Sequence, residues 1–138
     1  MIYLLDLNQT LVNRNRDDPR IRPFELQIER ETYRQELVKE LRGKRVILIT
    51  ARPTKYKTQT LEHIKELCDW QPDEAYFAEI KMFPHVKKEH LLRKYILKKH
   101  GTNGEQYFGI ESNPKTRAVY AKYGIRSTTW DEFLKSPF

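Results

Sequence analysis

The residues best suited to chemistry follow an apolar run at the start of the sequence. Residues 2–5 have the pattern of a buried strand that stops at Asp6, and the next turn carries Asn8 and Thr10. A carboxylate at the C-terminal end of a strand lies where open α/β sheets bind their ligands. Such a group can attack an electrophile or hold a hard cation. Asp6 is therefore the first candidate for a catalytic residue.

The rest of the chain alternates between strand-like and helical patterns. Apolar runs predict strands at 2–6, 45–50, 75–78, 106–110 and 125–128, and helical spacing predicts helices near 33–41, 61–68, 86–99 and 114–123. This alternation predicts an α/β fold with a three-layer, doubly wound, mostly parallel sheet of about five strands and right-handed crossovers. A length of 138 residues fits a single domain, 1–138.

Parallel strands end at one edge of their sheet, which brings residues together that are distant in the sequence. Asp6, Thr50, Ala78 and Glu111 each end or follow a predicted strand. We therefore expect them to converge at the C-terminal edge of the sheet.

The net charge is strongly positive, at +7. Such an excess favours a polyanionic partner, and nucleic acid is the first class to consider. The alternative is a basic surface that contacts only solvent. The segment after the first strand allows the same two interpretations. It carries four arginines, Arg14, Arg16, Arg20 and Arg22. Four nearby acidic residues could neutralise them: Asp17, Asp18, Glu25 and Glu29.

Hydropathy and cysteine content predict the compartment. No apolar run approaches the ~20 residues needed to span a membrane. Cys68 is the only cysteine, so no disulfide framework is expected, and a reducing cytoplasm is the default location.

Two motifs near the N-terminus resemble those of the haloacid dehalogenase-like (HAD) phosphohydrolases. Residues 6–11, Asp-Leu-Asn-Gln-Thr-Leu, resemble the first family motif, Asp-x-Asp-x-Thr-Leu. The apolar run that ends in Thr50 resembles the second.

Two later motifs complete the resemblance, which covers nearly the whole chain. The third family motif is a lysine near a helix start, for which Lys88 and Lys87 compete and Lys81 is more distant. The fourth is an apolar strand followed by an acidic pair, which is Glu111-Ser112 here. Together the four motifs imply a HAD-like fold.

The resemblance also implies a role for each residue. Asp6 would be the nucleophile that forms an aspartyl-phosphate, and Thr50 would hydrogen-bond a phosphoryl oxygen. Lys88 would offset the charge of the nucleophile and the phosphate. Mg²⁺ would neutralise the approaching anions, and its implied ligands are Asp6, the main-chain carbonyl of Asn8, Glu111 and Ser112.

Two positions depart from the family pattern. The second aspartate of the first motif, the family's general acid/base, is Asn8 here, and Ser112 replaces one member of the acidic pair. An amide cannot exchange a proton with a leaving alcohol or with water, and losing this catalysis typically costs ~10²–10⁴ in rate. A hydroxyl at position 112 weakens metal support, for which the longer Glu111 could compensate. Asn8 could also be an engineered replacement of aspartate.

Within the superfamily, the chain resembles the 3′-phosphatase domain of phage-type polynucleotide kinases. The likeness rests on Arg16, on Thr50-Ala51-Arg52, on Lys55-Tyr56-Lys57 and on an uncapped length, since we expect only one loop and one helix between the first two motifs. It implies that the substrate is bound by Arg52, Arg16 and Thr10.

Two functional hypotheses follow. The first is a Mg²⁺-dependent phosphohydrolase that acts on nucleic-acid or nucleotide phosphate ends and is impaired at the acid/base step. The second is a catalytically inactive pseudoenzyme that binds nucleic acid, a nucleotide or a partner protein, which the paired changes at Asn8 and Ser112 favour. A scaffold without a ligand is disfavoured, because polar motif residues persist at the strand ends.

Overall fold

The computed structural model describes residues 1–137, which form a five-stranded parallel sheet with helices on both faces. The strand order is β3-β2-β1-β4-β5. The strands are β1 (Ile2–Leu5), β2 (Arg45–Pro53), β3 (Glu74–Ala78), β4 (Tyr107–Ile110) and β5 (Arg126–Thr128). This arrangement confirms the predicted α/β fold with a doubly wound sheet.

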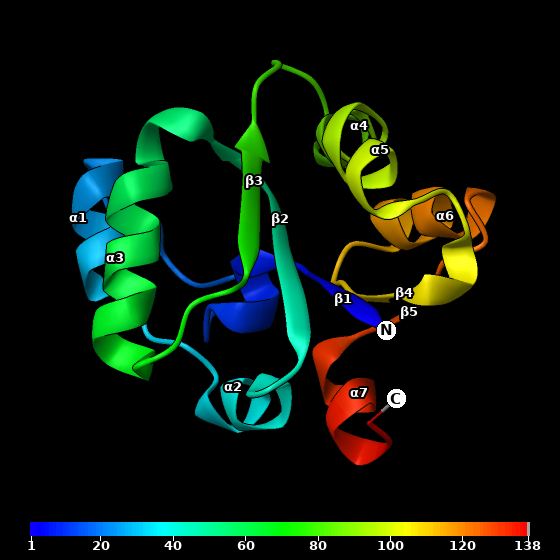
Figure 1. Ribbon diagram of the computed structural model, residues 1–138. Coiled ribbons are helices and arrows are strands. Elements are labelled where there is room, and N and C mark those ends of the chain that lie inside the picture. The colour runs from blue at the N-terminus through cyan, green and yellow to red at the C-terminus, as the bar shows by residue number, and fades with distance from the viewer. Residues whose placement is uncertain (138) are drawn as a thin grey trace.

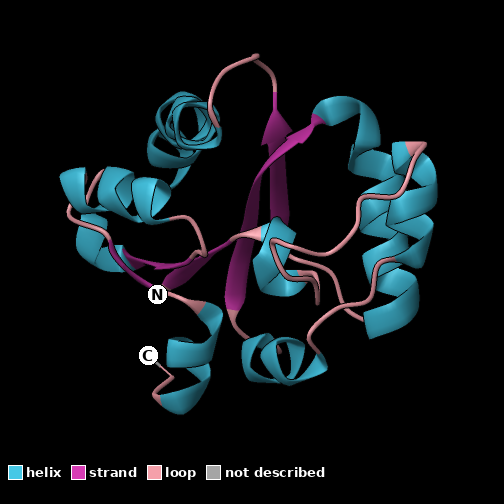
Figure 2. Cartoon of the chain, turned by 180° about the vertical axis from the view of Figure 1, so that it is seen from behind, coloured by secondary structure: helices cyan, strands magenta, loops and turns pink. Residues whose placement is uncertain are grey.

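Helices cover the sheet in two groups, which lie on opposite sides of it in Figure 1 and in the reverse view of Figure 2. The first group lies between β1 and β3 in sequence and consists of α1 (Phe24–Arg30), α2 (Gln35–Leu41) and α3 (Lys57–Cys68). The second consists of α4 (Pro84–Leu91), α5 (Leu97–His100) and α6 (Pro114–Lys122). A π-type turn at Leu92–Ile96 joins α4 to α5, and α7 (Trp130–Lys135) packs beside α2 on the first face.

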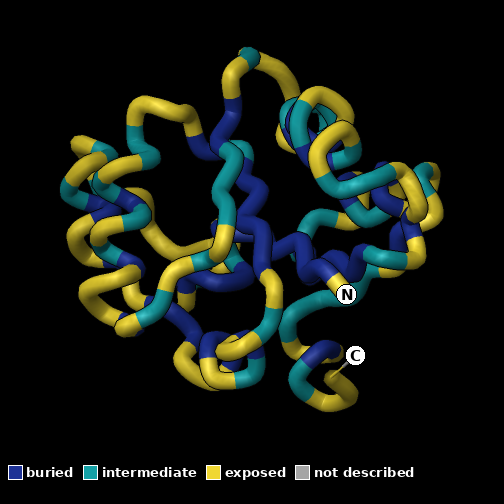
Figure 3. The backbone as a smooth tube through the Cα atoms, in the orientation of Figure 1, coloured by how far each residue is buried: buried dark blue, intermediate teal, exposed yellow. Residues whose placement is uncertain are grey.

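Strand residues point alternately into two hydrophobic cores. In β1, Tyr3 and Leu5 pack with side chains of α2, α3 and α7, whereas Ile2 and Leu4 pack with those of the second helical group. A strand that is buried on both faces must be apolar at every position, which explains uninterrupted runs such as 46–49. The three central strands, β1, β2 and β4, accordingly form the buried centre of the chain in Figure 3.

The segment between β1 and β2 differs from the expected single loop and single helix. It contains two short helices, and Tyr33, which was expected in a helix, pairs instead with Val12 in an isolated antiparallel bridge. Within α1 only Gln27 and Ile28 are buried, so this helix leaves almost no apolar periodicity in the sequence.

Strand β2 also extends further than expected, to Pro53 rather than Thr50. The register with β3 shifts between Ile49 and Pro53, and pairing resumes where Pro53 meets Ala78. The additional residues carry the chain past the sheet edge toward α3.

The connection between α5 and β4 packs main chain against main chain on the end of α6. A Cβ atom added at Gly104 would lie 2.2 Å from the carbonyl oxygen of Tyr123 and 2.5 Å from the carbonyl carbon of Gly124. Only glycine fits at position 104.

Within residues 1–137, no helix combines the length and the apolar character needed to cross a bilayer.

Candidate functional site

The centre of the sheet contains a topological switch point. Strands β2 and β3 extend the sheet on one side of β1, whereas β4 and β5 extend it on the other. In open α/β sheets such a point opens a crevice at the carboxyl ends of the strands. Asp6 follows β1 and Glu111 follows β4, and main-chain hydrogen bonds fix both residues: Asp6 N–H to Ile110 O at 3.0 Å and Glu111 N–H to Thr128 O at 2.9 Å.

Lys88 lies on helix α4 and bridges the carboxylates of Asp6 and Glu111. Its Nζ lies 2.6 Å from Asp6 Oδ1 and 2.5 Å from Glu111 Oε1. The three residues are almost inaccessible, at 3% exposed for Lys88, 4% for Asp6 and 1% for Glu111. Lys87, the competing candidate, instead donates to the main-chain oxygen of Ala51 at 3.3 Å, and Lys81 lies in the exposed connection before α4.

Burial and neighbouring charges shift the pKa values of these three groups in different directions. Burial alone would raise the pKa of Asp6, but the charge and hydrogen bond of Lys88, with a hydrogen bond from Thr10, hold it below the ordinary value. Burial and the negative charge of Asp6 raise the pKa of Glu111 to about 7. Burial opposes the charge on Lys88, but its two carboxylate partners raise its pKa above the ordinary value. Asp6 is therefore ionised at neutral pH, the state that the predicted role of nucleophile requires.

The second oxygen of Asp6 is oriented by hydroxyl groups. Asp6 Oδ2 accepts hydrogen bonds from Thr10 Oγ1 at 2.7 Å and from Ser112 Oγ at 2.9 Å. Thr10 reaches it because the turn Leu7–Leu11 folds back, with Gln9 in a left-handed conformation at φ 61°. Asp6, Thr10 and Ser112, three of the predicted site residues, thus lie together.

Oxygen donors for a cation converge on the same side. Ser112 Oγ lies 2.9 Å from Asp6 Oδ2 and 3.5 Å from the main-chain oxygen of Asn8. These hard oxygen ligands fit Mg²⁺, although only one of them carries a formal charge. The Glu111 carboxylate is engaged elsewhere, by Lys88 and by the Asn113 N–H at 3.0 Å. Among the described residues, no group of three or more His, Cys, Asp or Glu side chains is placed to hold a metal.

Arg52 lies behind Asn8 in a buried network. Its guanidinium forms a bidentate ion pair with Glu31, at 3.0 Å from Nη1 to Oε1 and 2.6 Å from Nη2 to Oε2. It also donates to Thr60 Oγ1 and to Asn8 Oδ1, each at 3.0 Å. Arg52 is 2% exposed, so its charge is balanced within the protein.

Thr50 lies within β2 and is completely buried. Its Oγ1 accepts the main-chain N–H of Arg52 at 3.1 Å, which leaves the hydroxyl proton available for donation. The hydrogen bond shapes the backbone at the irregular end of β2, so Thr50 also helps to position Arg52.

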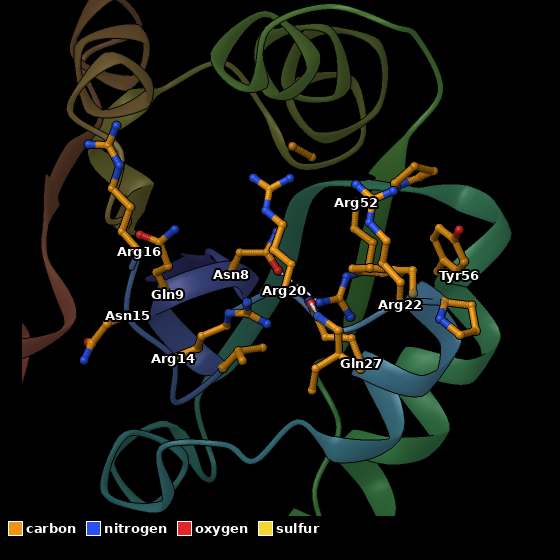
Figure 4. A pocket seen from close by; sticks show the side chains of 16 residues that line it. Asn8, Gln9, Arg14, Asn15, Arg16, Arg20, Arg22, Gln27, Arg52 and Tyr56 are labelled. Carbon is orange, nitrogen blue, oxygen red and sulfur yellow. Dashed lines mark hydrogen bonds between the residues drawn. The ribbon is translucent and has the colours of Figure 1, made fainter. Parts of the chain in front are cut away.

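A cavity of about 630 Å³ opens beside Asn8 and Arg52. Figure 4 shows side chains arranged around it, with Arg16 at one end and Arg52 and Tyr56 at the other. Five arginines line it, and no Asp or Glu does so within the described part of the chain; the arginines are Arg14, Arg16, Arg20, Arg22 and Arg52. Because Glu31 balances the charge of Arg52, the exposed arginines of this lining, Arg16, Arg20 and Arg22, are the ones that attract anions.

An aromatic pair forms part of the cavity wall. The rings of Phe24 and Tyr56 are 4.7 Å apart between centroids, and the guanidinium carbon of Arg52 lies 4.9 Å from the Phe24 ring. Phe24 was not predicted as a site residue, because its position depends on the unexpected helix α1. The signal for this cavity was the run of arginines at 14–22.

The acidic residues of the loop form no ion pairs with its arginines among the described contacts. Arg14 donates to main-chain oxygens of Asp18 and Pro19, and the Asp18 carboxylate accepts the Asn15 N–H. Arg14 thereby braces the loop, whereas Arg16, Arg20 and Arg22 are exposed at the cavity.

The fold has neighbours among solved structures. A chain of the structure described as the Pnkp1/Rnl/Hen1 RNA repair complex matches 92% of this chain, with a TM-score of 0.71 at 16% sequence identity. A chain of another structure, of the Pnkp1/Rnl/Hen1 complex, also matches 92%, with a TM-score of 0.70 at 15% identity. The likeness is one of fold, and this chain spans 41% and 44% of those two chains. No protein-family model and no curated protein matches the sequence.

Proposed function

We propose that this chain is a HAD-like phosphohydrolase that acts on the phosphorylated end of a nucleic acid or nucleotide, with a slowed proton-transfer step. One observation carries the proposal. The ionised Asp6 is held by Lys88, Thr10 and Ser112 at the switch point of the sheet, beside a cavity lined with arginine.

Asp6 supplies the nucleophile in this proposal. A carboxylate oxygen bonds to phosphorus while the phosphorus–oxygen ester bond breaks, and the leaving alkoxide takes its proton from water because Asn8 has none to give. A water molecule then attacks phosphorus, releases phosphate and restores the Asp6 carboxylate. Asp6, the Asn8 carbonyl and Ser112 would hold Mg²⁺, which supplies positive charge against the phosphate.

Charge and shape support a nucleic-acid end as substrate. Arginines grip phosphates through paired hydrogen bonds, and aromatic rings such as Tyr56 suit stacking on bases. The two structural neighbours named above belong to an RNA repair complex or to a complex of the same components. A net charge of +7 acts in the same direction.

Binding without turnover is the second candidate function. It is favoured by the hydrogen bond between Asn8 and Arg52, because that contact gives position 8 a structural role that needs no proton transfer. A binding protein of this kind would keep its affinity for a polyanion after Asp6→Ala, and the affinity would fall steeply with salt.

Phosphate release tests the proposal. We would assay an aryl phosphate and a 3′-phosphorylated oligonucleotide with Mg²⁺, using the unmodified protein, Asn8→Asp, Asp6→Ala and, as a control, Asp131→Ala, which removes an exposed carboxylate on α7. We expect release of aryl phosphate by the unmodified protein, faster release by Asn8→Asp and none by Asp6→Ala. If neither the unmodified protein nor Asn8→Asp released phosphate, binding would remain as the function.

A further inference from the structure

The connection between β3 and α4 exposes an aromatic ring at the carboxyl edge of the sheet. Phe83 is 71% exposed and its neighbour Met82 is 53% exposed, the two largest values among the exposed large apolar residues described. The Phe83 ring stacks with that of His85, at 6.2 Å between centroids and 13° between planes. Figure 3 shows this connection as an exposed arc beyond the end of β3.

The arc lies beside the site described above. Ala78, the last residue of β3, pairs with Pro53, which lines the arginine cavity. Lys87, one turn into α4, donates to the main-chain oxygen of Ala51, another lining residue. Lys88 extends from the same helix to Asp6. The connection that carries Phe83 and the arginine cavity therefore lie at the same edge of the sheet, near the end of β2.

The charge around the ring suits a polyanion. Residues 81–88 include three lysines and a histidine but no Asp or Glu. Lys88 is committed to carboxylates, but Lys81 is exposed and Lys87 is partly exposed. An apolar ring between lysines fits an unpaired base with phosphates on either side, because each base offers a flat face for stacking. An apolar surface of a partner protein would gain no binding energy from these lysines.

We propose that Phe83, backed by His85, is a stacking site for an unpaired nucleobase of a single-stranded nucleic acid whose phosphates occupy the arginine cavity. This inference rests on the proposed function and adds a second contact to it. In this arrangement the single-stranded nucleic acid crosses the sheet edge between the cavity and Phe83. Its affinity therefore depends on its length as well as on its terminal phosphate.

Fluorescence anisotropy with a labelled, 3′-phosphorylated single-stranded 10-mer tests the inference. Phe83→Ala should weaken binding roughly 5- to 150-fold, the range expected for loss of one base stack, and Phe83→Trp should restore it. Met82→Ala is the matched control, since it removes a neighbouring exposed apolar side chain without a ring, and should bind as the unmodified protein does. A nucleoside 3′-monophosphate, too short to reach both sites, should compete equally well in every variant.

Three results would overturn the stacking site. Unchanged affinity in Phe83→Ala, with losses in Arg20→Ala and Arg22→Ala, would remove this contact and leave the proposed function standing. Equal losses in Phe83→Ala and Met82→Ala would instead show that binding depends on the apolar surface of this connection in general and not on stacking by the ring. If the unmodified protein bound no oligonucleotide at all, the proposed function would fail together with the inference.

Discussion

The amide oxygen of Asn8 accepts a hydrogen bond from the guanidinium of Arg52, with 3.0 Å between Oδ1 and Nη2. A guanidinium has no acceptor, so this contact fixes the amide with its oxygen toward Arg52 and its NH₂ group elsewhere. Asn8 also lines the arginine cavity. Position 8 therefore presents to the cavity an NH₂ group that can neither give a proton to a leaving alkoxide nor take one from water, which is consistent with the slowed proton transfer of the proposed function.

Asn8→Asp should restore that step selectively. We expect a gain of about 10²–10⁴ in kcat/KM for an alkyl phosphate, whose leaving group needs a proton, and a much smaller gain for an aryl phosphate. Phosphate release from both esters gives the comparison. Equal gains on both substrates would mean that position 8 acts on phosphate binding rather than on proton transfer.

Lys88→Ala should destabilise the fold as well as the site. Without Lys88, Asp6 and Glu111 are two buried carboxylates with no cation between them, and breaking such an ion pair costs about 3–5 kcal/mol. Urea unfolding at pH 8 measures the loss. Lys87→Ala is the control and should stay within about 1 kcal/mol, since its Nζ contacts only one main-chain oxygen. Similar losses in the two variants would contradict the assignment.

Arg52 and Glu31 should behave as one unit in a double-mutant cycle. Arg52→Met leaves a buried carboxylate unpaired and should cost about 3–5 kcal/mol, whereas Arg52→Met combined with Glu31→Leu should cost less, because neither charge remains. Chemical denaturation of the single and double variants measures the coupling. Additive losses would show that the two side chains stabilise the fold independently.

Glu111 predicts an unusual dependence of stability on pH. Its pKa is about 7 in the folded protein and near 4.5 when unfolded, so between these values the folded state retains a proton that the unfolded state releases. The contribution of Glu111 to the free energy of unfolding therefore falls as the pH rises from about 4.5 to about 7, by on the order of 3 kcal/mol at most. The lowered pKa of Asp6 acts in the opposite sense but only below about pH 4.

Glu111→Gln provides the comparison for that prediction. Unfolding curves recorded with EDTA at several pH values should show the free energy of unfolding of the unmodified protein falling relative to that of Glu111→Gln as the pH rises across this window. A constant difference would mean that Glu111 titrates normally in the folded state.

Oligonucleotide binding should depend on salt through the exposed arginines of the cavity. Removing one phosphate contact, as in Arg20→Ala or Arg22→Ala, should lower the slope of log K against log salt by about 0.7–1. Lys135→Ala, an exposed cation on α7, should leave the slope unchanged. Anisotropy titrations at four salt concentrations would measure it, and an equal effect of Lys135 would point to diffuse attraction by the net charge.

The sheet and the position of Asp6 were predictable because both follow from local patterns. Apolar runs alternating with helices predict parallel strands, and parallel strands end at one edge, which brings Asp6 and Glu111 together. The choice between Lys87 and Lys88 was not predictable. Adjacent helical residues point about 100° apart, and only the packing of α4 against the sheet decides which one reaches the carboxylates.

The partner of Arg52 could not be predicted from the sequence for a related reason. Its partner Glu31 precedes it by 21 residues and is brought to it by α1, which has too few buried residues for its periodicity to be recognised. A family likeness can suggest that Arg52 meets a phosphate, but the pairing that neutralises it depends on tertiary packing. The loop arginines were visible as a cluster, and only the folded loop reveals which of them line the cavity.

Gly104 bears on how variation in this chain should be interpreted. Because a Cβ there would collide with the main chain of Tyr123 and Gly124, every substitution must displace the backbone. In a saturation library selected for function, position 104 would tolerate as little change as Asp6, although it touches no ligand. A selection for soluble expression alone would separate them: variants at 104 would be lost, whereas Asp6→Asn, which keeps the shape of the side chain, would survive.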